Sequence, residues 1–549
     1  MPATNPTMDI TQADYIIVGG GLTGCALASR LHQGNNALKI LILEAGPDST
    51  SNPDTTSFMG MFKLGSTLDW NFTSVPQPNT ADRVYSPRAG KTLGGGSLLN
   101  YGGWCRGDPK DYDQWAKTVG DNRWSYPGLL PFFRKSESYF DQTADPKEHG
   151  FEGPMHVTSV SASDGQRKYP LREPIRTAWT ELGIKHTTDS SGSTSGISEF
   201  LENWHNGKRQ PANLAYSLEG ITVLSDATIH RIVFSKGLLG YHYASAVLLT
   251  DGRTFEARKE IIICCGTMRT PQLLMLSGIG PEDVLSRFDI PVIHKAPEVG
   301  KNLWDHYAHY QNFKLREPEK GLALGSPLLT DPAYFKGMPV DWIVNEATPF
   351  HLLEAALKED GIDRSLLERP CHTESLVLYS TLGAPHIPMN GTYVSTSVML
   401  LNSTSRGSVS IASALPTDQP VIDPNHYATK ADQVCLIHGT RRILQALLGT
   451  PEGQKYFDSE APPPGFAKLG PNSSDAEIDA RIRATGEAHY HTAGTAAMGK
   501  VVDTNLRVYG VRGLRVVDAS VLPVAIGGHP QATLYALAEQ AAEIILKGL

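Results

Sequence analysis

Cysteine is scarce in this sequence. Six cysteines among 549 residues are too few for a disulfide framework. No C-x-x-C pair or Cys/His spacing is typical of a zinc site, so we expect no metal centre. Cys264 and Cys265 adjoin inside an apolar run, which favours a strand, and Cys25 lies where a helix should begin. We therefore expect reduced and mostly buried thiols.

The sequence also lacks an excess of positive charge and long apolar runs. Lys and Arg number 49 against 57 Asp and Glu, for a net charge of -8, and no basic cluster stands out, which argues against a nucleic-acid partner. No stretch approaches the roughly 18 apolar residues of a membrane span, and the polar residues 1–14 do not resemble a secretory signal. We expect a cytoplasmic protein with no membrane partner; a secreted protein whose signal had been removed would begin in the same way.

Internal repeats and low-complexity segments are absent as well. A chain of 59.6 kDa exceeds what one hydrophobic core usually supports, so we expect two domains, in a monomer or a homodimer. The 52 glycines indicate many tight turns or close approaches of the backbone to a ligand.

The first motif lies near the N-terminus. Residues 15–18 are a short β-branched and aromatic run, as a buried parallel strand requires. They are followed by G-x-G-x-x-G, with Gly19 for the tight turn, Gly21 for close approach to a pyrophosphate and Gly24 for packing of helix on strand. A helix is predicted over 25–31, and the N–H groups at its start would face the phosphates.

An acidic residue completes this motif. A second strand, residues 40–43, ends at Glu44, about 20 residues beyond the motif, where a ribose-binding carboxylate is usual. An acid there suits the free ribose of FAD or NAD better than the phosphate of NADP. Strand, glycines, helix, strand and acid together predict a dinucleotide site, and this segment leaves the choice of dinucleotide open.

Three further blocks carry a family resemblance. Residues 90–100 read GKTLGGGSLLN, residues 266–281 read GTMRTPQLLMLSGIGP, and residues 490–495 read YHTAGT, ahead of a His-Pro pair at 529–530. With these motifs in this order, the sequence resembles the glucose-methanol-choline (GMC) oxidoreductases. The resemblance runs from Asp14 to about Ile545 and is weak between about 310 and 400.

The resemblance implies FAD as the cofactor. Glu44 would bind the adenosine ribose, residues 94–100 would lie against the flavin, and residues 518–519 would lie near the pyrophosphate. Leu99 stands where some choline-oxidising relatives carry a flavin-linked histidine, so we expect non-covalent FAD, and Gly96 stands where the family usually has serine. The residues implied to bind the cofactor are Gly19, Gly21, Leu22, Thr23, Gly24, Glu44, Ala45, Arg88, Leu93, Gly94, Gly95, Ser97, Asn100, Tyr101, Gly102, Gly103, Ile229, Asp518, Ala519, His529, Pro530 and Gln531.

Two histidines are implied to carry the chemistry. Alcohol oxidation moves a hydride to the flavin and a proton to a base, and a histidine with its ordinary pKa of about 6.5 suits that base. By resemblance, His491 occupies the position of the base. His529 occupies a second position, which holds histidine or asparagine in most members and arginine in a formate-oxidising type. Their spacing alone does not indicate that they meet.

Other candidate residues receive more ordinary interpretations. We expect His489, His306 and His294 to be surface or hydrogen-bonded histidines without a catalytic role. Trp104 either packs in the interior or contacts the flavin or substrate, and both interpretations stay open.

The expected fold class is α/β with mixed α+β character. A Rossmann-like FAD-binding domain, residues 1–155, 205–310 and 480–549, would be interleaved with a substrate-binding domain, residues 156–204 and 311–479. The resemblance implies a mostly antiparallel sheet flanked by helices in the second domain, and the runs at 394–401 and 407–411 favour antiparallel strands. Residues 315–375 have little periodicity and would form a lid or a surface loop.

These features predict an FAD-dependent oxidoreductase that oxidises the CH–OH group of a small-molecule alcohol, with His491 as general base. A primary alcohol on an aromatic or secondary-metabolite body is expected, and the electron acceptor is O2 or another acceptor. The alternative is a non-redox lyase or cyclising synthase of the same family, in which the histidines act as acid and base. A non-catalytic flavoprotein is disfavoured because both histidines are present.

Overall fold

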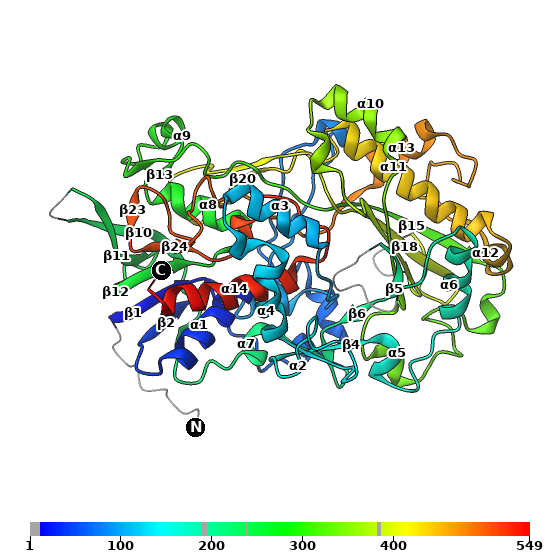
Figure 1. The fold of residues 1–549 in the computed structure, drawn as a ribbon, viewed down its shortest axis with the longest axis horizontal. Helices are drawn as coiled ribbons and strands as arrows, with labels where there is room; N and C mark the ends of the chain where they lie inside the picture. The colour runs from blue at the N-terminus through cyan, green and yellow to red at the C-terminus, as the bar shows by residue number, and fades with distance from the viewer. Residues whose placement is uncertain (1–10, 188–194, 238–239, 382–385, 549) are drawn as a thin grey trace.

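Two sheets organise the protein, one in each half of the molecule (Figure 1). The structure is a computed structural model and describes residues 11–187, 195–237, 240–381 and 386–548. Within these residues, no helix combines the length and the hydropathy that crossing a bilayer requires.

The first sheet has a parallel centre and an antiparallel edge. Its order is β10-β11-β12-β1-β2-β9, with β23 beside β11 and β24 beside β12. Strand β1 pairs in parallel with β12 and β2, whereas β10, β11 and β12 pair antiparallel. Strand β2 and the C-terminal residues of β1 and β12 are apolar and buried, because both faces of the parallel part of the sheet are covered. The strands are β1 (Gln12–Val18), β2 (Ile40–Leu43), β9 (Thr222–Leu224), β10 (Ile229–Lys236), β11 (His242–Leu249), β12 (Thr254–Ile263), β23 (Val511–Arg512) and β24 (Leu514–Val516).

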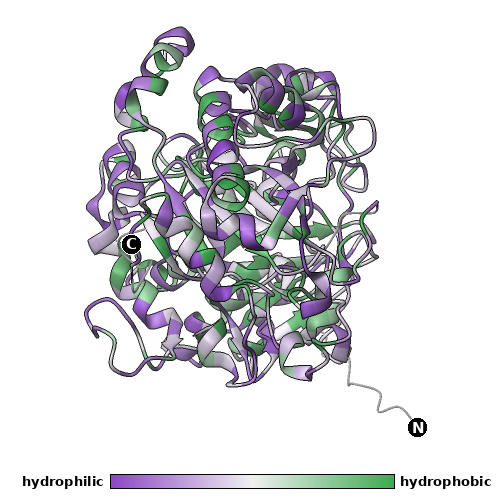
Figure 2. Cartoon of the chain, turned by 90° about the vertical axis from the view of Figure 1, so that its right-hand side faces the viewer, coloured by the Kyte–Doolittle hydropathy of each residue, from purple (hydrophilic) through white to green (hydrophobic). Residues whose placement is uncertain are grey.

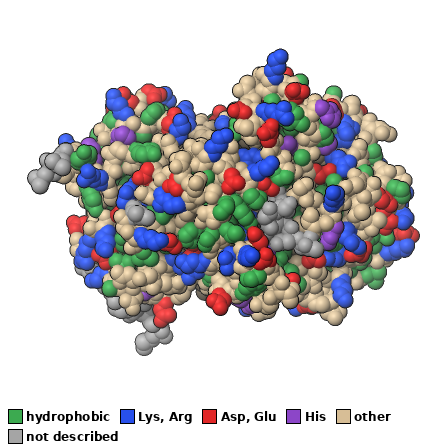
Figure 3. Space-filling view, viewed as in Figure 1, with side chains coloured by type: hydrophobic (Ala, Val, Ile, Leu, Met, Phe, Trp, Pro, Cys, Tyr) green, Lys and Arg blue, Asp and Glu red, His purple; other side chains and the backbone are tan. Residues whose placement is uncertain are grey.

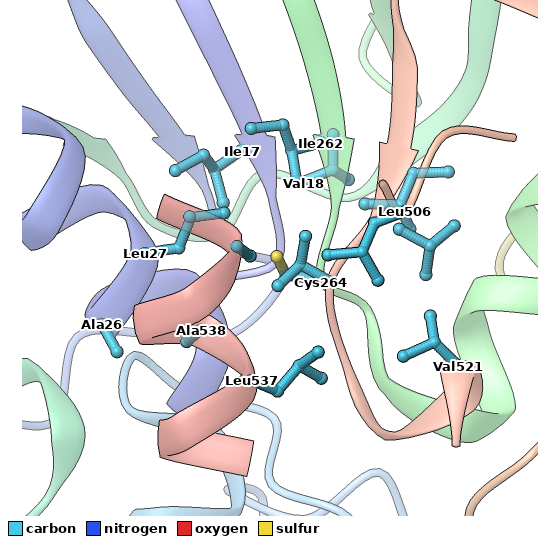
Figure 4. Packing of buried hydrophobic residues seen from close by; sticks show 14 of the residues in the cluster. Ile17, Val18, Ala26, Leu27, Ile262, Cys264, Leu506, Val521, Leu537 and Ala538 are labelled. Carbon is cyan, nitrogen blue, oxygen red and sulfur yellow. The ribbon is translucent and has the colours of Figure 1, made fainter. Parts of the chain in front are cut away.

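Two helices from opposite ends of the sequence pack together on this sheet. Helix α1 (Leu22–Gly34) follows the glycine motif, and α14 (Pro530–Leu546) ends the described chain. Figure 4 shows Leu27 of α1, Leu537 of α14 and Val18 of β1 in one cluster of fully buried hydrophobic side chains. The contact fixes the start of α14, and with it His529, against the glycine turn.

The second sheet is antiparallel throughout. Its order is β21-β15-β18-β17-β16-β5, with β22 beside β15. The strands are β5 (Gly196–Glu199), β15 (Tyr307–Leu315), β16 (Trp342–Glu346), β17 (Thr373–Leu378), β18 (Tyr393–Leu400), β21 (Phe457–Glu460) and β22 (Glu487–Ala488). A Rossmann-like sheet together with an antiparallel sheet confirms the expected fold class.

Helices flank the second sheet on its outer side (Figure 1). The longest of them packs on β17 and β18, and Gly439 allows this approach because a Cβ there would lie 2.8 Å from Val398 Cγ1. Figure 2 shows hydrophilic residues over much of the outer helices and loops, and hydrophobic residues toward the inside. These helices are α6 (Arg172–Glu181), α10 (Phe350–Asp360), α11 (Lys430–Leu444), α12 (Pro451–Tyr456) and α13 (Asp475–Thr485).

The remaining helices and strands lie outside these two sheets. The helices are α2 (Pro53–Thr56), α3 (Pro109–Val119), α4 (Tyr126–Ser136), α5 (Val160–Ser163), α7 (Ala212–Ala215), α8 (Gly266–Leu276) and α9 (Glu282–Arg287). The strands are β3 (Glu137–Tyr139), β4 (Met155–Ser159), β6 (Leu201–Glu202), β7 (Trp204–His205), β8 (Lys208–Arg209), β13 (Ile279–Gly280), β14 (His294–Lys295), β19 (Ser408–Ser410) and β20 (Val421–Asp423). The exact division of the chain into domains stays a prediction.

Two local expectations were wrong. Residues 315–375 are neither a lid nor a plain surface loop, because they contain β16, inside the second sheet, and α10. Strand β16 was not recognised in the sequence because it ends in polar residues, which are typical of a loop. In the structure Glu346, at its end, is paired with Arg442. Cys264 and Cys265 follow β12 rather than lying in it. All six thiols are free, and all but Cys265 are buried, as expected.

Candidate active site

A cavity of about 420 Å³ lies where the two halves meet. Its walls include the ends of β1, β2 and β12 on one side and residues of β15, β17 and β18 on the other. Figure 3 shows hydrophobic side chains gathered near the middle of the molecule, between the two halves. A position at the carboxyl ends of parallel strands is usual for dinucleotide sites.

Most residues that the sequence implied for cofactor binding meet in this one cavity. All of them line it except Gly24, Leu93 and Gly94, which lie just behind the glycine turn. A Cβ at Gly24 would lie 2.1 Å from Gly19 O, so this glycine serves the packing of helix on strand. The backbone N–H of Gly94 donates to Gly20 O at 2.7 Å, and Leu93 packs beside Gly20.

The two glycine-rich turns touch each other. Gly95 has φ +53°, and a Cβ on it would lie 2.7 Å from Gly21 Cα, so no larger residue fits. A Cβ on Gly96 meets nothing within 4 Å. The space beside Gly96 belongs to the cavity, whose wall here is bare backbone that a flat ligand can approach.

Glu44 is buried at the end of β2 with both carboxylate oxygens engaged. Oε2 accepts from Gly20 N and Oε1 from Gly46 N, each at 2.8 Å. Burial raises the pKa of Glu44 to about 7, although these backbone donors oppose the rise. The carboxylate is therefore fixed beside the first glycine turn, where a ribose of a dinucleotide would lie.

His491 follows β22 and is held by two neighbours. Its backbone N–H donates to Asp305 Oδ1 at 2.8 Å, and its Nδ1 lies 2.9 Å from His306 Nδ1. His306 Nε2 lies 3.0 Å from Ile526 O, which can only accept, so this nitrogen carries the proton of His306. His306 Nδ1 then accepts from His491 Nδ1–H, and the lone pair of His491 Nε2 stays free to take a proton.

Burial keeps this pair of rings neutral. It lowers the pKa of His306 to about 3. Burial, together with the neighbouring histidines, also lowers the pKa of His491 well below its usual value. Asp305 shares this environment, and burial raises its pKa to about 7. His491 is thus an uncharged ring with a fixed tautomer, ready to act as a base.

The surroundings of His529 favour its charged form, whereas those of His491 favour the neutral form. It caps the start of α14, and its Nε2 lies 2.8 Å from Glu374 Oε1 on β17. Burial works against a charge on His529, but the charge and hydrogen bond of Glu374 outweigh it and raise the pKa of His529. The rings of His491 and His529 have centroids 5.1 Å apart. Two groups with pKa values pushed in opposite directions, side by side in a cleft, are typical of an acid–base pair.

His489 is a third histidine in this cluster, and it is hydrogen-bonded. Its ring centroid lies 4.9 Å from that of His491 and 5.9 Å from that of His529. Its Nδ1 lies 2.5 Å from the hydroxyl of Tyr310 on β15, and both residues line the cavity.

Trp104 lies in the interior, outside the cavity wall. Its indole N–H donates to Glu137 Oε2 at 3.1 Å, and its ring stacks on Tyr535 with centroids 5.7 Å apart. The packing interpretation of Trp104 therefore holds.

Sequence reasoning missed Glu374, Asp305 and His306. Glu374 lies in the stretch where the family resemblance is weak, and no motif signals it. Asp305 and His306 lie within the span of the family resemblance, just before its weak stretch, and that position was the available signal.

On the side of the second sheet, strand β17 and the segments beside β5 and β16 give the cavity an apolar wall. This wall is formed by Phe200, Met338, Val340, Leu376 and Leu378. The ring of Phe200 stands edge-on to His529, with centroids 6.2 Å apart. A ligand that reaches the histidines thus has an apolar surface for its remaining atoms.

Family models and a curated relative match this chain to the same protein family. GMC oxidoreductase models match residues 13–308 and 403–538. The chain is 40% identical to the GMC-type oxidoreductase acuG of Aspergillus aculeatus, over 97% of this chain and 99% of that protein.

Solved structures of two oxidases superimpose on this chain over nearly its full length. A variant of the formate oxidase of Aspergillus oryzae superimposes with a TM-score of 0.87 at 27% identity, covering 100% of this chain and 99% of that one. A fungal aryl-alcohol oxidase superimposes with a TM-score of 0.79 at 26% identity, covering 98% and 99%. The chain therefore belongs to the GMC oxidoreductases, a family of FAD-dependent enzymes.

Proposed function

We propose that this enzyme oxidises the CH–OH group of a primary alcohol with an apolar, aromatic body, with His491 as general base and O2 as electron acceptor. The observation that carries the proposal is the pair formed by His491 and His529, one held neutral and one favoured as a cation, at the end of the cavity.

The residues of the cavity fit FAD. We assign the ribose to Glu44, the pyrophosphate to the turn at Gly19 and Gly21, and the flavin to the bare backbone beside Gly96. The open space at Gly96 and the fixed carboxylate of Glu44 support this assignment. When bound, FAD supplies a hydride acceptor.

The proton follows a separate path. His491 Nε2 takes the hydroxyl proton of the alcohol, and His491 Nδ1–H keeps its bond to His306, so the ring is not displaced as it becomes charged. His529, favoured in its protonated form by Glu374, donates a hydrogen bond to the oxygen as it gains alkoxide character. The two histidines thus stabilise the same oxygen, one by removing its proton and one by its charge.

The apolar wall supports an aromatic or similarly apolar substrate body. Phe200, Leu376 and Leu378 provide surface that a small charged substrate would not use. One structural relative is an aryl-alcohol oxidase and another a formate oxidase, so family membership alone does not set the substrate. His529 stands at the position where the resemblance gave arginine to the formate-oxidising type.

A substrate panel tests this proposal. Purified yellow protein is mixed without oxygen with a primary aryl alcohol, a short aliphatic alcohol, choline and formate, and flavin absorbance is followed. We expect the aryl alcohol to bleach the flavin fastest and admitted air to restore the colour. Faster bleaching by choline or formate would overturn the substrate class, and slow recovery in air would overturn O2 as acceptor.

A non-redox lyase or synthase is the second candidate, because an adjacent base and cation also suit acid–base catalysis. It would turn over its substrate with no bleaching in the same experiment.

A further inference from the structure

His489, His491 and His529 share an arrangement that alcohol oxidation does not require. One ring nitrogen of each histidine lies within 4.8 Å of those of the other two. His489 adds the third nitrogen, although the base and the cation of the proposed function are His491 and His529.

Each of the three rings is anchored through one nitrogen. His489 Nδ1 is bonded to Tyr310. His491 Nδ1 is bonded to His306, and His529 Nε2 to Glu374. The other nitrogen of each ring has no hydrogen-bond partner among the residues that the structure describes.

This pattern is that of histidines that ligate a transition metal. Such histidines use one nitrogen for the metal and bond the other to a carboxylate, carbonyl or similar group, which fixes the ring. Three imidazoles with an open fourth position are a common zinc site. Tyr310, His306 and Glu374 are the corresponding outer partners here.

We propose that His489, His491 and His529 form a site for Zn²⁺ or a similar borderline divalent cation, and that the bound ion inhibits the enzyme. The ion forms three bonds to nitrogen, His529 gives up the proton on its Nδ1 to solvent, and the ion loses water, so no oxidation or reduction accompanies binding. It uses the free lone pair of His491, which then cannot take a proton. The fourth position of the ion stays open toward the cavity.

The rings need only small movements to close around the ion. Zn–N bonds of about 2.0–2.1 Å require the three nitrogens to approach to about 3.4 Å of one another. The present limit for one nitrogen of each ring is 4.8 Å, and the three rings are partly exposed and can turn to shorten it. Ordinary side-chain torsions supply such a rotation.

Direct measurement of zinc binding tests the site. Purified FAD-loaded protein is dialysed against zinc chloride in chelator-free buffer, and bound zinc is measured by mass spectrometry. The wild type is compared with His489→Asn, Tyr310→Phe and a control, His156→Asn. His156 is stacked on His205, with ring centroids 3.8 Å apart, and does not line the active-site cavity. Flavin absorbance checks that each variant is folded.

We expect one zinc ion per wild-type chain and unchanged binding by His156→Asn. His489→Asn loses a ligand and should bind at least tenfold more weakly, and Tyr310→Phe, which loses an outer partner, about 10–100-fold more weakly. If either variant fails to fold, the other still decides. No zinc on the wild type, or equal affinity in all folded variants, would overturn the site. Because zinc is measured directly, the result is independent of whether the substrate is an alcohol.

Discussion

Replacing Glu374 by glutamine removes the charge that holds a proton on His529. The side chain keeps its size, and its amide oxygen can still accept from His529 Nε2, which now lies 2.8 Å from Glu374 Oε1. Glu374 is buried and His529 is mostly covered, with side chains 2% and 12% exposed, so solvent does little to replace the lost charge. We expect Glu374→Gln to change the protonation of His529 more than the shape of the cavity.

The size of the effect follows from the hydrogen bond. A hydrogen bond to a charged group contributes about 1.5–3 kcal/mol, and one pKa unit corresponds to about 1.4 kcal/mol. The pKa of His529, which Glu374 raises against the effect of burial, should therefore fall by roughly one to two units. A neutral donor is about half as strong as a charged one, so flavin reduction should slow about tenfold near neutral pH.

The assay is the rate of anaerobic flavin reduction by alcohol across pH. His529 must hold a proton, so the wild-type rate falls as pH rises through the pKa of His529. His491 must be neutral, so the rate also falls as pH drops through its lowered pKa. Glu374→Gln should move the alkaline fall to lower pH by about one to two units and leave the acid fall in place.

Glu346→Gln is the matched control. Glu346 is a partly buried carboxylate of the same sheet, bonded to Arg442 at 2.8 Å away from the cavity. It should lose some stability and keep the wild-type pH profile. If Glu374→Gln reduces its flavin at the wild-type rate with an unmoved alkaline fall, or if Glu346→Gln produces the same shift, the charge of Glu374 does not control the protonation of His529.

Three further variants test other parts of the site. His491→Ala should keep the yellow FAD but slow its reduction by about two to four orders of magnitude, because it removes the general base; unchanged stopped-flow kinetics would exclude that role. His306→Leu leaves His491 Nδ1–H without its acceptor and should slow reduction about 10–100-fold at unchanged FAD content; a wild-type rate would show that the tautomer is fixed by other contacts. Gly95→Ala should lose FAD, because its Cβ would lie 2.7 Å from Gly21 Cα. Gly96→Ser should keep FAD, because a Cβ at this position has no other atom within 4 Å. Equal FAD content of the two purified proteins would contradict the assignment of these glycines to the cofactor site.

The sequence predicted the parts of the site that depend on local pattern. Gly19, Gly21 and Glu44 could be found because a strand–turn–helix unit places them by short-range geometry alone. The meeting of His491 and His529 could be anticipated only from the family resemblance, because their spacing does not encode it.

The residues that tune these histidines could not be found in this way. Glu374 reaches His529 because two sheets from different parts of the chain meet at the cavity. His306 and His489 have no pattern of their own; their roles depend on which nitrogen faces which partner. Residues 315–375 were misjudged because β16 ends in polar residues that a distant helix neutralises through Arg442.

In the proposed function, this enzyme takes a hydride from the carbon of an alcohol. The most direct test mixes the yellow protein, without oxygen, with a primary aryl alcohol carrying either hydrogen or deuterium on the carbinol carbon. We predict loss of flavin absorbance with both, several-fold slower with deuterium because that C–H bond breaks in the reductive step. A flavin that stays yellow with every primary alcohol tried, or bleaching that is insensitive to deuterium and to His491→Ala, would exclude hydride transfer from an alcohol to the flavin with His491 as the base.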